Sequence, residues 1–318
     1  MSARTSFLAL LLLAACSPTP STPAPTVEPV VVPGSSGPPV VDAVALARAR
    51  TAMSTLGTTL KGTLVATMST EGPTAAMEVC SQDAMSLTAT VAANTSVTVG
   101  RSSLRLRNPD NAAPSWVQEW LEGQGERPAE NVEGQQTTAV LADGTAVVRV
   151  VAPLPIEAPC LVCHGPNEGR LPELTEALTA KYPEDHATGY VIGDLRGAIW
   201  AEAPVVDSGL ELVANGDAKW PMDESTREAI GELRTALAGP ALTDMPATAA
   251  LAEGLDASLT KMVQGCTMDG ASHDQLHHFL GVFFPTLDAL KAATTVQAAN
   301  DTRILLQVQV IEYDMFFE

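Results

Sequence analysis

Apolar residues recur three, four or seven positions apart between Val44 and Met68, which predicts a long amphipathic helix. The sequence Glu71-Gly72-Pro73 interrupts this pattern, and proline is favourable in the first turn of a helix. We therefore expect a second helix that runs from Pro73 to about Ala92.

Strand-like segments and short helices follow. The expected strands cover residues 96–106, 137–141, 146–152 and 197–201, and the expected short helices cover residues 114–121 and 174–181. Asp143-Gly144, between the second and third strands, is a strong hairpin signal. The pattern therefore predicts an α+β domain over residues 43–204, in which helices precede a small antiparallel sheet.

From residue 205 onward the pattern is helical. Asp223 can cap a helix from Glu224 to Leu237, and Gly239-Pro240 ends it. Further amphipathic segments cover residues 247–264, 272–290 and 291–317. Four helices with short connections predict that residues 205–318 form an all-α domain that resembles a four-helix bundle.

The N-terminus has the features of an export signal. Arg4 precedes an apolar run from Phe7 to Ala15, which is too short to span a bilayer permanently. Leu13-Ala14-Ala15-Cys16 resembles the bacterial lipobox, so we expect residues 1–15 to be a lipoprotein signal peptide and Cys16 to carry the lipid. An ordinary secretory signal followed by an unrelated cysteine is the alternative.

The signal peptide implies a location in the cell envelope. Ser17 rather than Asp follows Cys16, which favours an outer-membrane anchor with the protein facing the periplasm. Residues 16–42 are rich in Pro, Ser and Thr and predict an extended tether. No later segment approaches the roughly 18 apolar residues that a membrane-spanning helix needs.

Composition narrows the function classes. The net charge of −19 makes nucleic acid an unsuitable partner, because a polyanion would be repelled. The charge mainly favours solubility, and it could also steer a basic redox partner. The remaining residues leave room for two modest domains.

Residues 160–164 read Cys-Leu-Val-Cys-His, the attachment signature for c-type haem. Positions i, i+3 and i+4 share one face of a helix, so Cys160 and Cys163 can reach the two vinyl groups of one porphyrin while His164 faces its iron. The alternatives are a chance pentapeptide, a redox C-x-x-C pair or half of a zinc site, although no second ligand pair follows soon after. The export signal agrees with the haem interpretation, because bacteria attach c-type haem outside the cytoplasm.

The residues alone do not identify the second axial ligand of the iron. The candidates in the first domain are Met53, Met68, Met77, Cys80, Met85 and His186. Methionine would make a conventional high-potential electron carrier, whereas a thiolate would stabilise ferric iron. Cys80 is notable because secreted proteins rarely keep an unused thiol. It could instead pair with Cys266 in a disulfide, or be a small buried hydrophobic residue.

Several short segments together suggest a family. They are Met77–Cys80, Val99–Pro109, Cys160–Gly165, Tyr182–Asp185, Ala187–Tyr190 and Gly193–Gly197. In their identity and order, over about residues 45–202, the chain resembles a family of small bacterial mono-haem c-type proteins with a PAS-like fold. The resemblance implies that His164 and Cys80 hold the iron, and that the haem packs against a small antiparallel sheet.

The resemblance also suggests roles for the arginines near residue 100. Arg101 and Arg105 could bind the haem propionates or backbone carbonyls, as could Arg107, and surface exposure is the alternative. If residues 101–107 form a strand, these arginines share one side of it. His186 is expected in an exposed loop.

The helical domain contains one candidate metal site. His273 and His277 are one helical turn apart and follow Cys266 and Met268 in the sequence. Nitrogen and sulfur ligands of this kind suit copper(I) or zinc. The alternative is an ordinary helix start, with Ser272 as the cap and the histidines partly exposed.

Two functions from different classes follow. The first is a redox or gas-responsive sensor with a Cys/His-ligated haem, which would signal through another protein. The second is a periplasmic electron-transfer cytochrome. An enzymatic activity is not predicted, because no acid–base pair can be distinguished.

Overall fold

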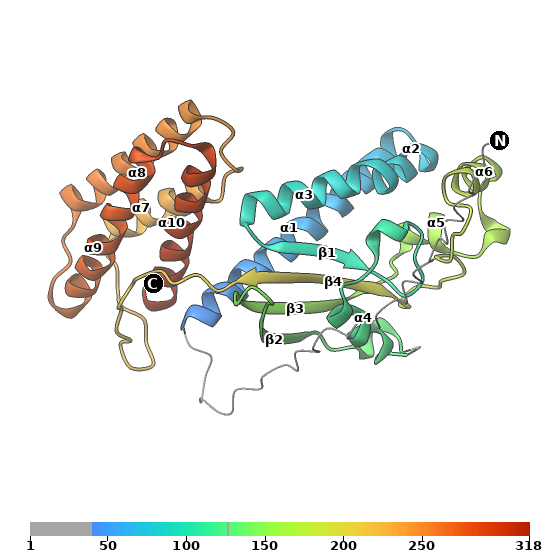
Figure 1. Ribbon diagram of the computed structural model, residues 1–318, viewed down its shortest axis with the longest axis horizontal. Helices are drawn as coiled ribbons and strands as arrows, with labels where there is room; N and C mark the ends of the chain where they lie inside the picture. Colours follow the sequence, from blue (N-terminus) through green and yellow to red (C-terminus); the bar gives the residue numbers. More distant parts are fainter. Residues whose placement is uncertain (1–39, 126) are drawn as a thin grey trace, which may run out of the picture. The chain divides into compact units, whose positions relative to one another are not determined.

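A four-stranded antiparallel sheet, in the order β1-β4-β3-β2, organises the N-terminal part of the chain (Figure 1). The computed structural model describes residues 40–125 and 127–318. The strands are β1 (Thr98–Ser102), β2 (Gln135–Val140), β3 (Ala146–Pro155) and β4 (Leu195–Pro204). The predicted mixture of helices with a small antiparallel sheet is confirmed. The predicted signal peptide, Cys16 and all but the last residues of the tether lie outside the described residues.

The predicted hairpin is confirmed as the β2–β3 connection. Gly144 has φ 89°, a conformation that glycine adopts without penalty. The Asp143 carboxylate accepts a hydrogen bond from the Thr145 backbone N–H at 2.9 Å, which closes the turn. The hairpin therefore forms from local interactions.

Helices surround the sheet. They are α1 (Val40–Thr70), α2 (Pro73–Glu78), the π-helix η1 (Val79–Asp83), α3 (Ala84–Thr95), α4 (Ser115–Glu122), α5 (Leu161–His164) and α6 (Pro172–Lys181). Single 3₁₀ turns cover Pro109–Asn111, Ala129–Asn131, Ala158–Cys160 and Asn167–Gly169. The helix predicted from Pro73 to about Ala92 is present, but the π-helix η1 interrupts it.

Helix α1 packs along β1, β3 and β4. Its small residues Ala49 and Ala52 are fully buried against valines and alanines of the sheet, and they allow a close approach. Leu56 lies in the same cluster and is also fully buried. Truncation of such a leucine to alanine costs about 2–5 kcal/mol of folding free energy. The interface of α1 with the sheet is therefore a main part of this core.

The strand predicted over residues 96–106 was too long, since β1 ends at Ser102. The Ser103 hydroxyl oxygen lies 3.1 Å from the Arg105 backbone N–H and 3.2 Å from the Arg105 carbonyl oxygen. These local contacts replace the next ladder hydrogen bonds and turn the chain out of the sheet. Arg101 is therefore on a strand, whereas Arg105 and Arg107 are in a loop, so the expectation that they share one strand face was wrong.

The C-terminal region is helical, as predicted. Its helices are α7 (Glu224–Leu237), α8 (Met245–Gly265), α9 (Gly270–Ala292) and α10 (Val296–Phe316). Asp223, Asp244 and Thr295 cap α7, α8 and α10 by accepting hydrogen bonds from backbone N–H groups three residues later. Among the described residues, no helix is both long and apolar enough to cross a membrane.

Candidate haem-binding cavity

A cavity of about 390 Å³ in the N-terminal part brings together Cys80, Cys160, Cys163 and His164. Its apolar walls come from several elements. They include Leu60, Leu64 and Met68 of α1, Met77 of α2, Leu154 of β3 and Ile199 of β4. Residues more than 80 positions apart in the sequence therefore surround one largely apolar space.

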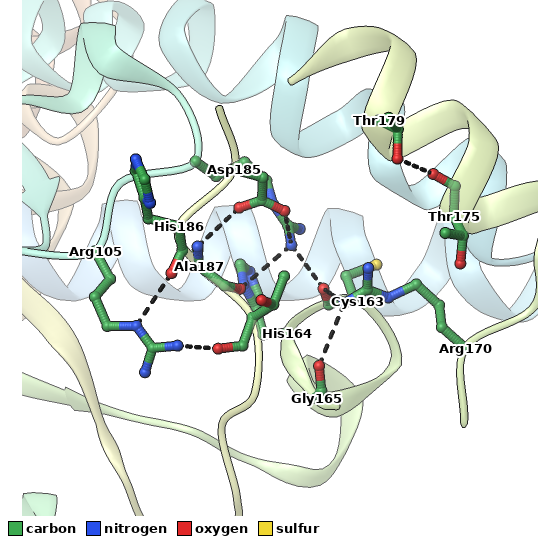
Figure 2. Close-up of polar contacts among 12 residues, drawn as sticks. Arg105, Cys163, His164, Gly165, Arg170, Thr175, Thr179, Asp185, His186 and Ala187 are labelled. Atoms are coloured by element: carbon green, nitrogen blue, oxygen red, sulfur yellow. Dashed lines mark hydrogen bonds and ion pairs between the residues drawn. The ribbon is translucent and has the colours of Figure 1, made fainter. Parts of the chain in front are cut away.

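The attachment motif begins in a 3₁₀ turn and continues into the single helical turn α5. So short a helix leaves its last carbonyls without intrahelical partners. Two arginines supply donors: the Cys163 carbonyl accepts from Arg107 at 2.6 Å and from Arg170 at 3.0 Å, and the Gly165 carbonyl accepts from Arg170 at 3.3 Å (Figure 2). The arginines thereby hold the motif in place.

His164 has a defined orientation. Its Nδ1 atom lies 2.7 Å from the carbonyl oxygen of Ala187 (Figure 2). A carbonyl oxygen can only accept, so Nδ1 carries the proton and Nε2 keeps a free lone pair. Burial lowers the pKa of His164 to about 2, and the charges of Arg196 and Arg107 act in the same direction. The side chain is therefore a neutral imidazole, the form that ligates metals.

Asp185 and Arg107 organise the loop beside His164. The Asp185 carboxylate accepts from Arg107 Nε at 3.0 Å and from the Ala187 backbone N–H at 2.8 Å. Backbone hydrogen bonds from Gly189 to Gly165 and from Tyr190 to His164, each 3.0 Å, join the loop to the motif. Loop and motif therefore form one connected unit.

Cys80 lies in the π-helix η1 and lines the cavity. Single π turns inside helices frequently occur at functional sites. Cys80 and Cys266 are both free thiols in the structure, so the alternative disulfide is not formed. Of the other candidate ligands, Met68 and Met77 also line the cavity.

The remaining candidates do not face this space. Met53, a residue of α1, packs in the core between this helix and the sheet. Met85 is an exposed side chain on α3. His186 is exposed, as expected for a loop residue.

The arginines divide into two groups. Arg101 and Arg196 line the cavity, and neither forms a salt bridge with a carboxylate among the described residues. Arg105 does not line the cavity, because its guanidinium donates to the carbonyls of His186 and Thr188. Of the three arginines suggested for the propionates, the structure places Arg101 and Arg107 at the cavity, Arg107 in an ion pair with Asp185, and gives Arg105 a loop-holding role.

Three groups of the site were not predicted from the sequence. They are Arg196, Arg170 and the backbone carbonyl of Ala187. Arg196 lies within a segment, Gly193–Gly197, that had already marked the resemblance, so its charge was an available signal. Arg170 and the Ala187 carbonyl act through tertiary contacts, which the spacing of residues in the sequence does not reveal.

The candidate metal site in the helical region is only partly assembled. Nε2 of His273 and Nε2 of His277 are 3.1 Å apart. Cys266 and Met268 instead pack against the core of the helical region, and Met268 sulfur accepts from the Thr226 hydroxyl at 3.5 Å. Within residues 40–125 and 127–318, no three or more His, Cys, Asp or Glu side chains gather as a metal site.

Comparisons with known proteins bear on the N-terminal part. No curated protein matches the chain. A solved structure with similarity is the crystal structure of the cyanobacterial haem protein Tll0287, with 24% identity, a TM-score of 0.37, and coverage of 48% of this chain and 92% of that one. The model of the Tll0287-like family matches residues 39–204, more than half of this sequence. The chain therefore belongs to the Tll0287-like family.

Proposed function

We propose that this protein is a c-type haem protein that acts as a redox or gas-responsive sensor, with His164 and Cys80 as the axial ligands of the iron. The observation that carries the proposal is the gathering of Cys80, Cys160, Cys163 and His164 around one cavity. Membership of the Tll0287-like family agrees with this cofactor, because the cyanobacterial protein Tll0287 is a haem protein.

The chemistry of the cavity fits a haem group. The apolar walls suit the porphyrin face, and Nε2 of His164 is available as a ligand. Arg101 and Arg196 place two cations at the cavity, where they can pair with two propionates. When bound, haem iron supplies one-electron redox chemistry and a binding position for small gases.

The choice between sensor and electron carrier depends on Cys80. A thiolate stabilises ferric iron, and its bond to ferrous iron is weaker, so reduction favours release of the ligand. The π-helix η1 supports such a role, because its hydrogen-bonding pattern differs from that of α2 and α3 on either side. The alternative is a periplasmic electron-transfer cytochrome, in which both ligands stay bound and a basic partner docks on the acidic protein.

The location is part of the proposal. The lipobox-like sequence ending at Cys16 supports an exported protein held at the outer membrane by lipid and facing the periplasm. The small antiparallel sheet with helices beside it supports a PAS-like haem domain. A sensor of this kind requires a signalling protein as its partner.

One experiment tests the proposal and separates its two forms. The full chain, expressed in cells that attach c-type haem, should retain haem through acid–acetone extraction, and the Cys160→Ser, Cys163→Ser variant should not. The reduced protein is then mixed with CO or NO. Rapid formation of an adduct supports the sensor, whereas an unreactive six-coordinate spectrum would establish the electron carrier instead.

We propose a second, separate site at His273 and His277 on α9. Two metal–nitrogen bonds of about 2.0–2.1 Å that meet at 90–110° place their nitrogens about 3 Å apart, and the two Nε2 atoms are separated by 3.1 Å. This separation is compatible with both nitrogens binding one copper or zinc ion. Calorimetric titration with zinc should show one site that His277→Ala removes, with His278→Ala as the control; equal binding by both variants would contradict this site.

A further inference from the structure

The carbonyl oxygen of Ala187 is shared by two donors of different kinds. His164 Nδ1 lies 2.7 Å from it, and Arg107 Nη2 lies 3.3 Å from it. A carbonyl oxygen has two lone pairs and can accept both hydrogen bonds. Ala187 is fully buried, so water does not compete for this oxygen.

Asp185 completes the arrangement. Its carboxylate accepts from Arg107 Nη2 at 2.9 Å as well as from Nε, and the exposed fractions of the two side chains are 9% for Arg107 and 11% for Asp185. The same carboxylate accepts from the Ala187 backbone N–H. The ion pair thus holds the Ala187 residue by both its N–H and its C=O.

We propose that the Arg107–Asp185 ion pair is a positioning device that sets the electron donation of His164 to the haem iron, and thereby the redox potential. The inference rests on the proposed ligation by His164. Partners of the non-ligating nitrogen are known to fix the orientation and raise the basicity of a metal-binding histidine. A guanidinium that shares the same carbonyl draws electron density from it, so the Nδ1–H is polarised less.

The direction of the effect follows. With Arg107 in place, Ala187 is a weaker acceptor, His164 donates less to iron, and ferric haem is stabilised less. Loss of the guanidinium should therefore lower the midpoint potential. Loss of the Asp185 charge should raise it, because Arg107 is then uncompensated and free to interact more strongly with the carbonyl.

Arg105 provides a matched control from the same loop. Its guanidinium donates to the carbonyls of His186 and Thr188, which flank Ala187, and it makes no contact with the Ala187 carbonyl among the described hydrogen bonds. It carries the same charge as Arg107. Arg105→Gln therefore removes a nearby positive charge and a loop contact without changing the acceptor of His164.

The test is an equilibrium redox titration of the haem-loaded full chain at one pH, with ferric EPR spectra of each variant. Relative to wild type, Arg107→Gln should lower the potential and Asp185→Asn should raise it, and Arg105→Gln should shift it less than Arg107→Gln. A purely structural role predicts that both variants of the pair shift the potential in the same direction. Shifts of equal sign, or an Arg105→Gln shift as large as that of Arg107→Gln, would overturn the proposal.

A double variant covers the case in which a single charge removal prevents folding. Arg107→Gln with Asp185→Asn leaves the net charge unchanged and removes the guanidinium from Ala187, so the potential should still fall and the ferric EPR g-values should change. A wild-type potential and spectrum in the double variant would refute the inference. Failure of the proposed function itself looks different: wild type would then lack covalent haem, or His164→Ala would leave its spectrum unchanged.

Discussion

Nδ1 of His164 donates a hydrogen bond to the carbonyl oxygen of Ala187 over 2.7 Å, although the two residues are 23 positions apart in the sequence. This contact selects the tautomer with a free Nε2 atom. It also joins the attachment motif to the loop held by Arg105 and Arg107. The ligand geometry of the cavity therefore depends on a loop that contributes no ligand.

Replacement of Cys80 tests the second axial ligand. Cys80→Ala should change the ferric absorption and EPR spectra from those of a low-spin thiolate complex and raise the midpoint potential, because a thiolate stabilises ferric iron. Met77→Leu is the matched control, since Met77 lines the same cavity and leucine conserves its volume. An unchanged spectrum in Cys80→Ala, or a large change in Met77→Leu, would reject Cys80 as the ligand.

Arg170→Ala should destabilise the folded protein by about 1–3 kcal/mol, because the carbonyls of Cys163 and Gly165 lose a charged donor. Urea unfolding at neutral pH measures the change. Arg127 is a suitable control: it is exposed and donates to the carbonyls of Gly123 and Gln124, not to a carbonyl of the motif. Arg127→Ala should cost less than about 0.5 kcal/mol; equal losses in the two variants would contradict a special role for Arg170.

Gly197 is needed for the close approach of β1 and β4 at the cavity. A Cβ atom at this position would collide with the carbonyl oxygen of Ser102. Gly197→Ala should therefore cost about 1–3 kcal/mol of stability. Gly62→Ala, on an exposed face of α1 with no atom near the added methyl, should instead stabilise by about 0.4–1 kcal/mol. Thermal unfolding of both variants checks the contrast, and a neutral Gly197→Ala would show that the strands can separate freely.

Asp223 predicts a pH dependence in the helical region. Partial burial opposes ionisation, but hydrogen bonds from Thr267 and Thr226 outweigh it and lower the pKa of Asp223 to about 2. The unfolded value is about 3.9, so the folded state binds fewer protons, and the stabilisation is complete above pH 4 and lost as the pH falls towards 2. Asp223→Asn should be less stable than wild type at pH 7, and the difference should shrink as the pH falls from 4 to 2.

The control for this pH dependence is Asp244→Asn. Asp244 also caps a helix, but the structure gives its carboxylate a single backbone N–H, from Ala247. Asp244→Asn should therefore cost less stability at pH 7 than Asp223→Asn. A difference between Asp223→Asn and wild type that stays constant from pH 7 to pH 2 would exclude the proposed cause.

Features with local causes were predictable from the sequence. Asp143-Gly144 specifies its own turn. Asp223 caps the N-terminus of the helix predicted from Glu224 to Leu237, and the observed helix has the same bounds. The end of β1 was missed because a serine at position 103 can continue a strand or close a turn, and its neighbours do not discriminate between the two. The same ambiguity led to the wrong placement of Arg105.

The attachment chemistry was also accessible from spacing alone, because Cys160, Cys163 and His164 lie within one helical turn. The cavity was not. Cys80 precedes the motif by 80 positions, and Ala187 follows it, so their meeting depends on the packing of α1 and α2 and on the arginine contacts of the loop. Spacing reports which groups can act within a turn of helix, whereas only long-range packing decides which groups from different elements share one apolar space.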